Sequence, residues 1–172
     1  MPRYVAFLRG VSPANASMPA LQRCFEQAGF ENVRTLLSSG NVVFDARKAS
    51  HAALERRAEA AMRDGLGHAF DTVVRSCAEL QALLEADAFS RHALPADAKR
   101  VVSFLRDPQA APAPALPVEE EGARILERIG GEVYTFYTPT PKGPVFMQLL
   151  ERHFGKDITT RTWDTVRKCA GA

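Results

Sequence analysis

The chain has 172 residues, of which 46% are hydrophobic and 24% charged, proportions that are ordinary for a folded globular protein. Its 22 basic and 20 acidic residues give a net charge of +2, which is too small to indicate nucleic-acid binding by itself. The apolar run over residues 4–8 is far shorter than a membrane-spanning helix and lacks the flanks of a secretory signal. We therefore expect no membrane association. The 3 cysteines form no C-x-x-C pair and suit reduced thiols, so we expect a cytoplasmic protein.

The first 76 residues alternate between strand and helix patterns. Apolar residues recur at helical spacing after Ser17, a plausible N-cap, and Gly29 stands where a helix C-cap belongs. Two β-rich runs flank Ser38-Ser39-Gly40, which predicts a tight hairpin. The predicted elements are a strand over residues 3–9, a helix over 18–28, strands over 33–37 and 41–44, a helix over 49–64 and a strand over 71–75. This β-α-β-β-α-β order is that of the ferredoxin-like plait.

The second half repeats the theme less regularly. Residues 107–117 contain four prolines and predict a loop where a helix would otherwise stand. Gly130-Gly131 predicts a second hairpin. The predicted elements are a helix over residues 78–86, strands over 99–105, 124–129 and 132–137, a helix from about 145 to 154, an extended run over 157–160 and a helix over 163–169.

We therefore predict an α+β protein of two ferredoxin-like (α-β plait) subdomains. The second is the less regular, and a C-terminal helix follows it. The first would span residues 1–86 with its linking helix, and the second residues 99–172.

The plait topology predicts one polar edge. In a sheet of strand order 4-1-3-2, the first two strands run the same way, so the loop after strand one and the hairpin after strand two emerge together. We call this edge the rim. The residues expected there, beside residues 65–68, are Arg9, Gly10, Ser12, Asn15, Ser38, Ser39 and Asn41. Turn chemistry alone also explains serine, glycine and asparagine at such positions. The alternative is a ligand site in which Arg9, Ser12, Asn15, Ser39 and Asn41 bind an anion.

The start of the last helix contains several side chains that can contact a ligand. Thr160 and Arg161 could bind a phosphate, because helix N-termini favour anions. Asp164 already places a carboxylate at that end and would compete. The structural alternative makes Thr162 the N-cap and Trp163, the only tryptophan, an anchor in the core.

No residue pattern identifies a reaction. The 4 histidines show no metal-binding spacing, and no dinucleotide or P-loop glycine motif is present, so we expect neither a metal nor a cofactor. Cys24 falls beside the apolar face of the first helix and is interpreted as buried packing, although an enzyme using Cys24 or a rim serine stays an alternative. RNA binding is disfavoured, because residues 41–45 contain one aromatic, Phe44, and lack the basic lead residue of RNA-reading strands.

Three ordered motifs carry a family resemblance. The runs YVAFLRG (4–10), VRTLLSSGNVVF (33–44) and TTRTWDTV (159–166) resemble the bacterial domain-of-unknown-function 1697 family over nearly the full length. The resemblance implies an α+β protein of two plait-like subdomains and implies no activity. Many members carry an Asn-Val-Gly-Gly-type loop after the first strand, where this chain has Ser12-Pro13-Ala14-Asn15. If that loop binds a ligand, this protein binds a different one or binds it differently.

Our leading hypothesis is binding of a small anionic or nucleotide-like ligand, polar or phosphate-bearing, at the rim. An enzyme of unknown class is the second hypothesis. A protein-interaction module, in the form of a homodimer through an exposed sheet face or edge strand, is the third.

Overall fold

The computed structural model describes residues 1–143 and 145–172. Over these residues the fold is mixed α+β, with two antiparallel sheets and five α-helices, as the predicted α+β class requires. The chain forms two compact units, of which the first is Met1–Ala82 with Arg167–Ala172 and the second is Leu83–Val166. The boundaries expected from sequence, 1–86 and 99–172, stay a prediction. No helix in the described ranges is long and apolar enough to cross a membrane.

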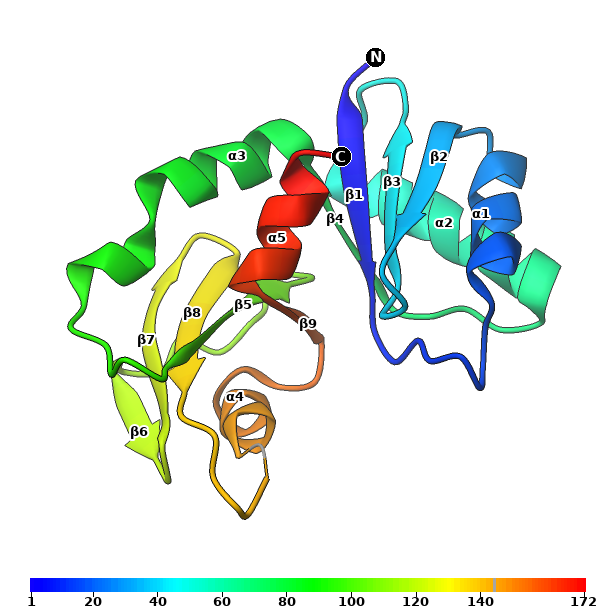
Figure 1. The fold of residues 1–172 in the computed structure, drawn as a ribbon. Coiled ribbons are helices and arrows are strands. Elements are labelled where there is room, and N and C mark those ends of the chain that lie inside the picture. The colour runs from blue at the N-terminus through cyan, green and yellow to red at the C-terminus, as the bar shows by residue number, and fades with distance from the viewer. Residues whose placement is uncertain (144) are drawn as a thin grey trace. The chain divides into compact units, whose positions relative to one another are not determined.

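The first unit holds a four-stranded sheet of order β2-β3-β1-β4, in which every neighbouring pair is antiparallel. The predicted hairpin joins β2 to β3. Figure 1 shows the elements, which are β1 (Arg3–Leu8), α1 (Met18–Gln27), β2 (Glu31–Leu36), β3 (Asn41–Asp45), α2 (His51–Leu66), β4 (Thr72–Ser76) and the start of α3 (Cys77–Ala86).

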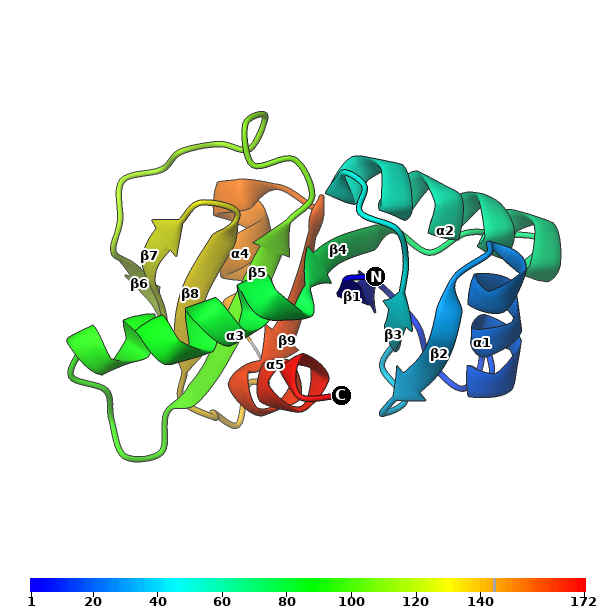
Figure 2. The ribbon, with the colours of Figure 1, turned by 90° about the horizontal axis from the view of Figure 1, so that it is seen from above.

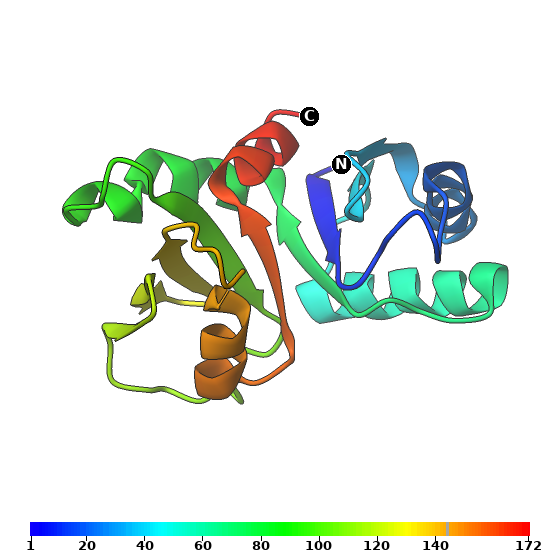
Figure 3. The same ribbon diagram turned by 60° about the horizontal axis from the view of Figure 1, so that its bottom comes forward.

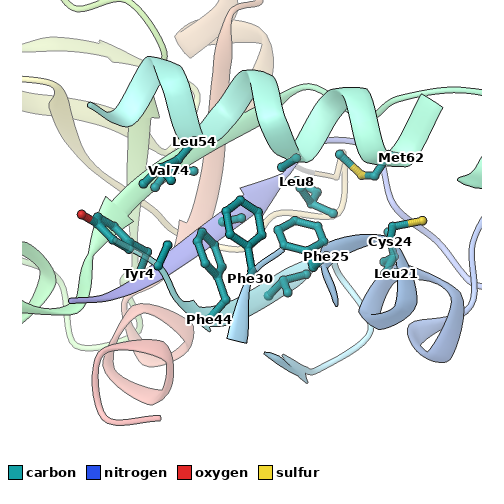
Figure 4. Packing of buried hydrophobic residues seen from close by; sticks show 14 of the residues in the cluster. Tyr4, Leu8, Leu21, Cys24, Phe25, Phe30, Phe44, Leu54, Met62 and Val74 are labelled. Carbon is teal, nitrogen blue, oxygen red and sulfur yellow. The ribbon is translucent and has the colours of Figure 1, made fainter. Parts of the chain in front are cut away.

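Helices α1 and α2 lie on the same side of this sheet (Figure 2). Helix α1 begins as the sequence predicts, because the Ser17 hydroxyl accepts a hydrogen bond from the backbone N–H of Ala20 at 3.2 Å. Its apolar face, which includes Phe25, forms a group of aromatic rings with Phe30, just before β2, and Phe44 of β3 (Figure 4). Within that group the rings of Phe30 and Phe44 stack with their centroids 4.2 Å apart, and Phe25 packs 5.6 Å from Phe44. These fully or almost fully buried rings make the core of the first unit.

Strand β4 is an edge strand of the sheet, and α2 caps its outer backbone groups. Glu55 accepts a hydrogen bond from the Val74 N–H at 2.9 Å, and Glu59 accepts one from the Thr72 N–H at 3.0 Å. Glu55 and Glu59 are four residues apart on a helix, and Thr72 and Val74 are two residues apart on a strand. Both spacings correspond to about 6 Å, so each carboxylate lies opposite one N–H group. Two N–H groups that would otherwise attract another strand are therefore occupied.

The second unit holds a five-stranded sheet of order β6-β7-β8-β5-β9. Helix α4 contacts β7 and β8 on one face of it (Figure 3). The elements are a 3₁₀ helix (Ala88–Arg91), β5 (Lys99–Leu105), β6 (Val118–Glu120), β7 (Ala123–Ile129), β8 (Glu132–Tyr137), α4 (Phe146–Phe154), β9 (Ile158–Thr162) and α5 (Trp163–Ala170).

Two elements of the second unit were not predicted. The 3₁₀ helix and β6 are four and three residues long, too short for a periodic pattern to identify. Residues 107–117 contain no helix or strand, as their prolines predict. The Arg128 side chain holds this segment in place, donating to the carbonyl oxygens of Pro108 and, at 3.3 Å, of Pro112.

Candidate ligand-binding rim

The topology brings together the two segments from which the rim was expected. Strands β1 and β2 are both antiparallel to β3, so they run in the same direction and their C-terminal ends lie at the same edge of the sheet (Figure 1). The backbone N–H of Leu8 donates to the carbonyl of Gly40 at 2.8 Å and ties the end of β1 to the hairpin. The Arg9 N–H donates to the Asp71 carbonyl at 2.9 Å, which adds the segment before β4.

Gly40 permits this close approach. Its φ is +85°, in the left-handed region that side-chain-bearing residues rarely adopt. A Cβ atom added there would lie 2.8 Å from Val11 Cγ2, 2.9 Å from Val11 Cβ and 3.0 Å from Leu8 Cβ. Glycine therefore serves both the turn and the contact between the hairpin and the loop after β1.

The two asparagines of the rim have their amide groups engaged within the chain. Asn15 Oδ1 accepts from the Ser12 N–H at 2.8 Å, and Asn15 Nδ2 donates to the Gly10 carbonyl at 2.8 Å. Asn41 is fully buried, and its Nδ2 donates to the Leu36 carbonyl at 3.1 Å and to Ser39 Oγ at 3.0 Å. Both amides hold loop geometry, which is the turn chemistry that the sequence left open as an alternative.

The remaining polar side chains of the rim differ in their exposure to solvent. Ser38 and Ser39 are exposed at the turn, whereas Ser12 and Arg9 are partly buried. The hydroxyls of Ser12 and Ser38 make no hydrogen bond to any residue in 1–143 or 145–172. Two neutral donors and one guanidinium on adjoining loops are the kind of groups that bind an oxyanion.

Thr160 and Arg161 lie on β9, in the second unit. The Thr160 hydroxyl is 2.7 Å from Ser103 Oγ on β5, and Arg161 Nη1 donates to the Thr160 carbonyl at 2.9 Å. Both side chains therefore have bonding partners on or beside their own sheet.

The start of α5 agrees with the structural interpretation, in which Thr162 caps the helix and Trp163 anchors it in the core. Thr162 Oγ1 accepts a hydrogen bond from the Thr165 N–H at 3.2 Å, so the predicted N-cap is confirmed. Trp163 is 4% exposed and packs edge-on against Phe89, at 5.0 Å between centroids, and Tyr134, at 6.4 Å. Burial, with Glu132 and Glu127 nearby, raises the pKa of Tyr134 to about 12.

The thiol of Cys24 is buried, and that burial raises its pKa. A buried thiol with a raised pKa is a weak nucleophile. Among the described residues, no three His, Cys, Asp or Glu side chains are grouped to hold a metal ion.

One cavity of the first unit was not predicted from the sequence. It lies where α2 and α3 begin and contains His51, Cys77 and Glu79. The only local signal was the Ser76-x-x-Glu79 pattern, which forms a capping box. The Glu79 N–H donates to Ser76 Oγ at 3.0 Å and the Ser76 N–H to Glu79 Oε2 at 3.3 Å.

Among proteins with curated descriptions, none matches this chain. A solved structure described as the conserved bacterial protein SP0830 from Streptococcus pneumoniae is similar, with a TM-score of 0.69 and 20% sequence identity. The similarity covers 99% of this chain and 97% of that chain, and at this identity it shows the fold alone. Residues 1–134 match the family described as "Protein of unknown function (DUF1697)". Because the match extends over more than half of the sequence, the chain belongs to the DUF1697 family.

Proposed function

We propose that the rim binds a small polar or phosphate-bearing ligand. The observation that carries this proposal is the pair of hydroxyls, Ser12 and Ser38, that lack a hydrogen-bond partner in the described chain and stand on two loops held together through Gly40. Arg9 would supply the positive charge and Ser39 a further hydroxyl. Asn15 and Asn41 would position the loops through the bonds already described.

Two further proposals concern the fold type of each unit and the cellular location of the protein. We propose that each unit is a ferredoxin-like plait, because the order β2-β3-β1-β4 and the order β7-β8-β5-β9 both correspond to 4-1-3-2. The free thiols of the described chain support a cytoplasmic location. A ligand role for Thr160 and Arg161 stays a separate prediction for the second unit.

An enzyme that uses Cys24 is the weaker alternative, since burial keeps its thiol from solvent and raises its pKa. A homodimer stays a prediction as well. The rim hypothesis has the advantage that the Ser38 and Ser39 side chains are exposed and that hydroxyl and guanidinium groups suit one class of ligand, an oxyanion.

The test is a titration with inorganic phosphate, ribose 5-phosphate and AMP, followed by the amide resonances of the ¹⁵N-labelled protein. We expect the largest shifts at Ser12, Ser38 and Gly40. Ser38→Ala and Arg9→Gln should each weaken binding about tenfold, the effect of losing one charge-assisted hydrogen bond. Arg56→Gln, an exposed substitution on α2, is the matched control and should bind as wild type does. Shifts that avoid the rim, or rim variants that bind as tightly as the control, would refute the proposal.

A further inference from the structure

A second candidate site lies at the opposite end of the first sheet from the rim. It is a cavity of about 500 Å³, formed where β1, α2 and α3 begin, and all of its lining residues belong to the first unit. That volume is in the range of small-molecule sites in proteins, about 300–1,000 Å³. Strand β1 starts at this cavity and ends at the rim, so the two sites are separated by the length of the strand.

Tyr4 contributes its hydroxyl to the lining of the cavity. The residue is 4% exposed, and its ring stacks on Phe44 with centroids 5.8 Å apart. Figure 4 shows its hydroxyl pointing away from the aromatic cluster. This hydroxyl has no hydrogen-bond partner among the residues that the structure describes, and it is not one of the buried atoms without a partner, so it is open to the cavity. A group bound in the cavity can accept a hydrogen bond from it.

Among the basic residues that line the cavity, Lys48 is the one without a carboxylate partner in the described ranges. Arg3 Nη1 is paired with Asp45 at 2.9 Å, and His51 Nε2 is 3.0 Å from Glu79 Oε1. Burial raises the pKa of Glu79, but hydrogen bonds from His51 and the Ser76 N–H, together with electrostatic attraction to His51 and Arg75, lower it by more, so Glu79 is ionised at neutral pH. Lys48 is exposed at the cavity and forms no ion pair within the described ranges.

The walls between these polar groups are apolar. Tyr4, Ala49, Cys77 and Ala78 are among the apolar residues that line the cavity, and Cys77 is itself only 8% exposed. Burial raises the pKa of the Cys77 thiol, so it lines the cavity as a small apolar side chain and not as a thiolate.

We propose that this cavity binds a small organic carboxylate with an apolar body. The carboxylate would accept hydrogen bonds from the Tyr4 hydroxyl and the Lys48 ammonium, and the apolar body would lie against the Tyr4 ring and Cys77. Lys48, which has no ion pair in the described ranges, matches a single negative charge. A phosphate dianion would bring a second charge close to the Glu79 carboxylate, which repels it. Both the location and the ligand class differ from those of the rim.

The probe is 2-naphthoate, with 2-naphthamide as its uncharged isostere. Thermal shift and amide titration of the ¹⁵N-labelled full chain measure binding, and a ligand that binds only the native state raises its melting temperature. We expect naphthoate to raise the melting temperature and to shift amides near residues 48–51 and 76–79. Naphthamide should bind at least about tenfold more weakly, because it lacks the charge.

Two variants test the named contacts. Tyr4→Phe removes only the oxygen and keeps the ring packing, so the melting temperature of the free protein should stay close to that of wild type. Lys48→Gln removes the exposed charge, and Arg47→Gln is its matched neighbour, exposed and outside the cavity lining. We expect Tyr4→Phe and Lys48→Gln each to weaken naphthoate binding about tenfold. Arg47→Gln and the rim variant Ser38→Ala should leave it unchanged.

Three results would overturn the proposal. These are naphthamide binding as tightly as naphthoate, naphthoate shifts confined to the rim, and equal affinities for Tyr4→Phe, Lys48→Gln and the Arg47→Gln control. Because phosphate binding at the rim is measured with other ligands and other variants, failure at one site is distinguishable from failure at the other.

Discussion

Replacing Gly40 by alanine tests whether close packing of the hairpin on the loop after β1 builds the rim. The substitution has two separable costs. An L-residue at φ +85° loses about 1–2 kcal/mol from the left-handed backbone alone. The added Cβ would also lie 2.8 Å from Val11 Cγ2 and 3.0 Å from Leu8 Cβ, and overpacking of this kind costs about 1–3 kcal/mol.

The total expected loss is therefore about 2–5 kcal/mol, a large part of the roughly 5–15 kcal/mol that stabilises a typical domain. Gly10→Ala is a matched control, because Gly10 has the same φ of +85° and a Cβ added there meets no atom within 4 Å. It should show the backbone cost alone. The difference between the two variants then measures the contact with Val11 and Leu8.

Urea unfolding followed by far-UV circular dichroism is the suitable assay. The fluorescence of the only tryptophan, Trp163, reports on the second unit and would miss a local effect in the first. If Gly40→Ala and Gly10→Ala lose the same free energy of unfolding, the close approach contributes nothing and the packing argument is wrong.

Three further predictions concern other features of the fold. Glu55→Ala should cost about 1–3 kcal/mol by leaving the Val74 N–H without its acceptor, and amide exchange at Val74 should accelerate; unchanged exchange would contradict the edge-capping role. Hydrogen bonds from Asn32 and Arg3 hold the pKa of Asp45 below its usual value. This contribution is present above about pH 4 and is lost as the pH falls through the lowered pKa, so the stability difference between wild type and Asp45→Asn should shrink in acid. A difference that is constant from pH 7 to pH 2 would argue against it. Thr162→Ala should lower the unfolding free energy by about 1 kcal/mol and Thr162→Ser by less, whereas equal losses would exclude the cap.

Much of the local structure could be predicted because its causes are local. Ser17 and Thr162 cap their helices through bonds to residues three positions ahead, so the sequence alone contains both partners. The hairpin at Ser38-Ser39-Gly40 follows from the need for a positive φ in a tight turn. Strand β6 lacked such a signal, because three residues show no period and its pairing with β7 is decided by contact.

The candidate sites divide in the same way. Polar residues at the ends of neighbouring strands predicted the rim, and topology brought them together. That the amides of Asn15 and Asn41 are engaged in internal hydrogen bonds could not be predicted, since Asn41 reaches Leu36 and Ser39 only once the hairpin has closed. The cavity at the start of α2 and α3 had no sequence signature, because its residues come from three segments that are distant in the chain.

The sequence by itself determined the α+β class, the order of elements in the first unit, the hairpin and the helix caps, because periodicity and capping act within a few residues. It also identified the family. Tertiary structure alone decided which polar groups are used internally and which stay available. The sequence does not show whether a serine, an asparagine or a tyrosine side chain bonds within the protein or stays available to a ligand. Only the folded arrangement of its neighbours decides that. The unbonded hydroxyls of Tyr4, Ser12 and Ser38, among the described residues, are where that distinction leads to a test of function.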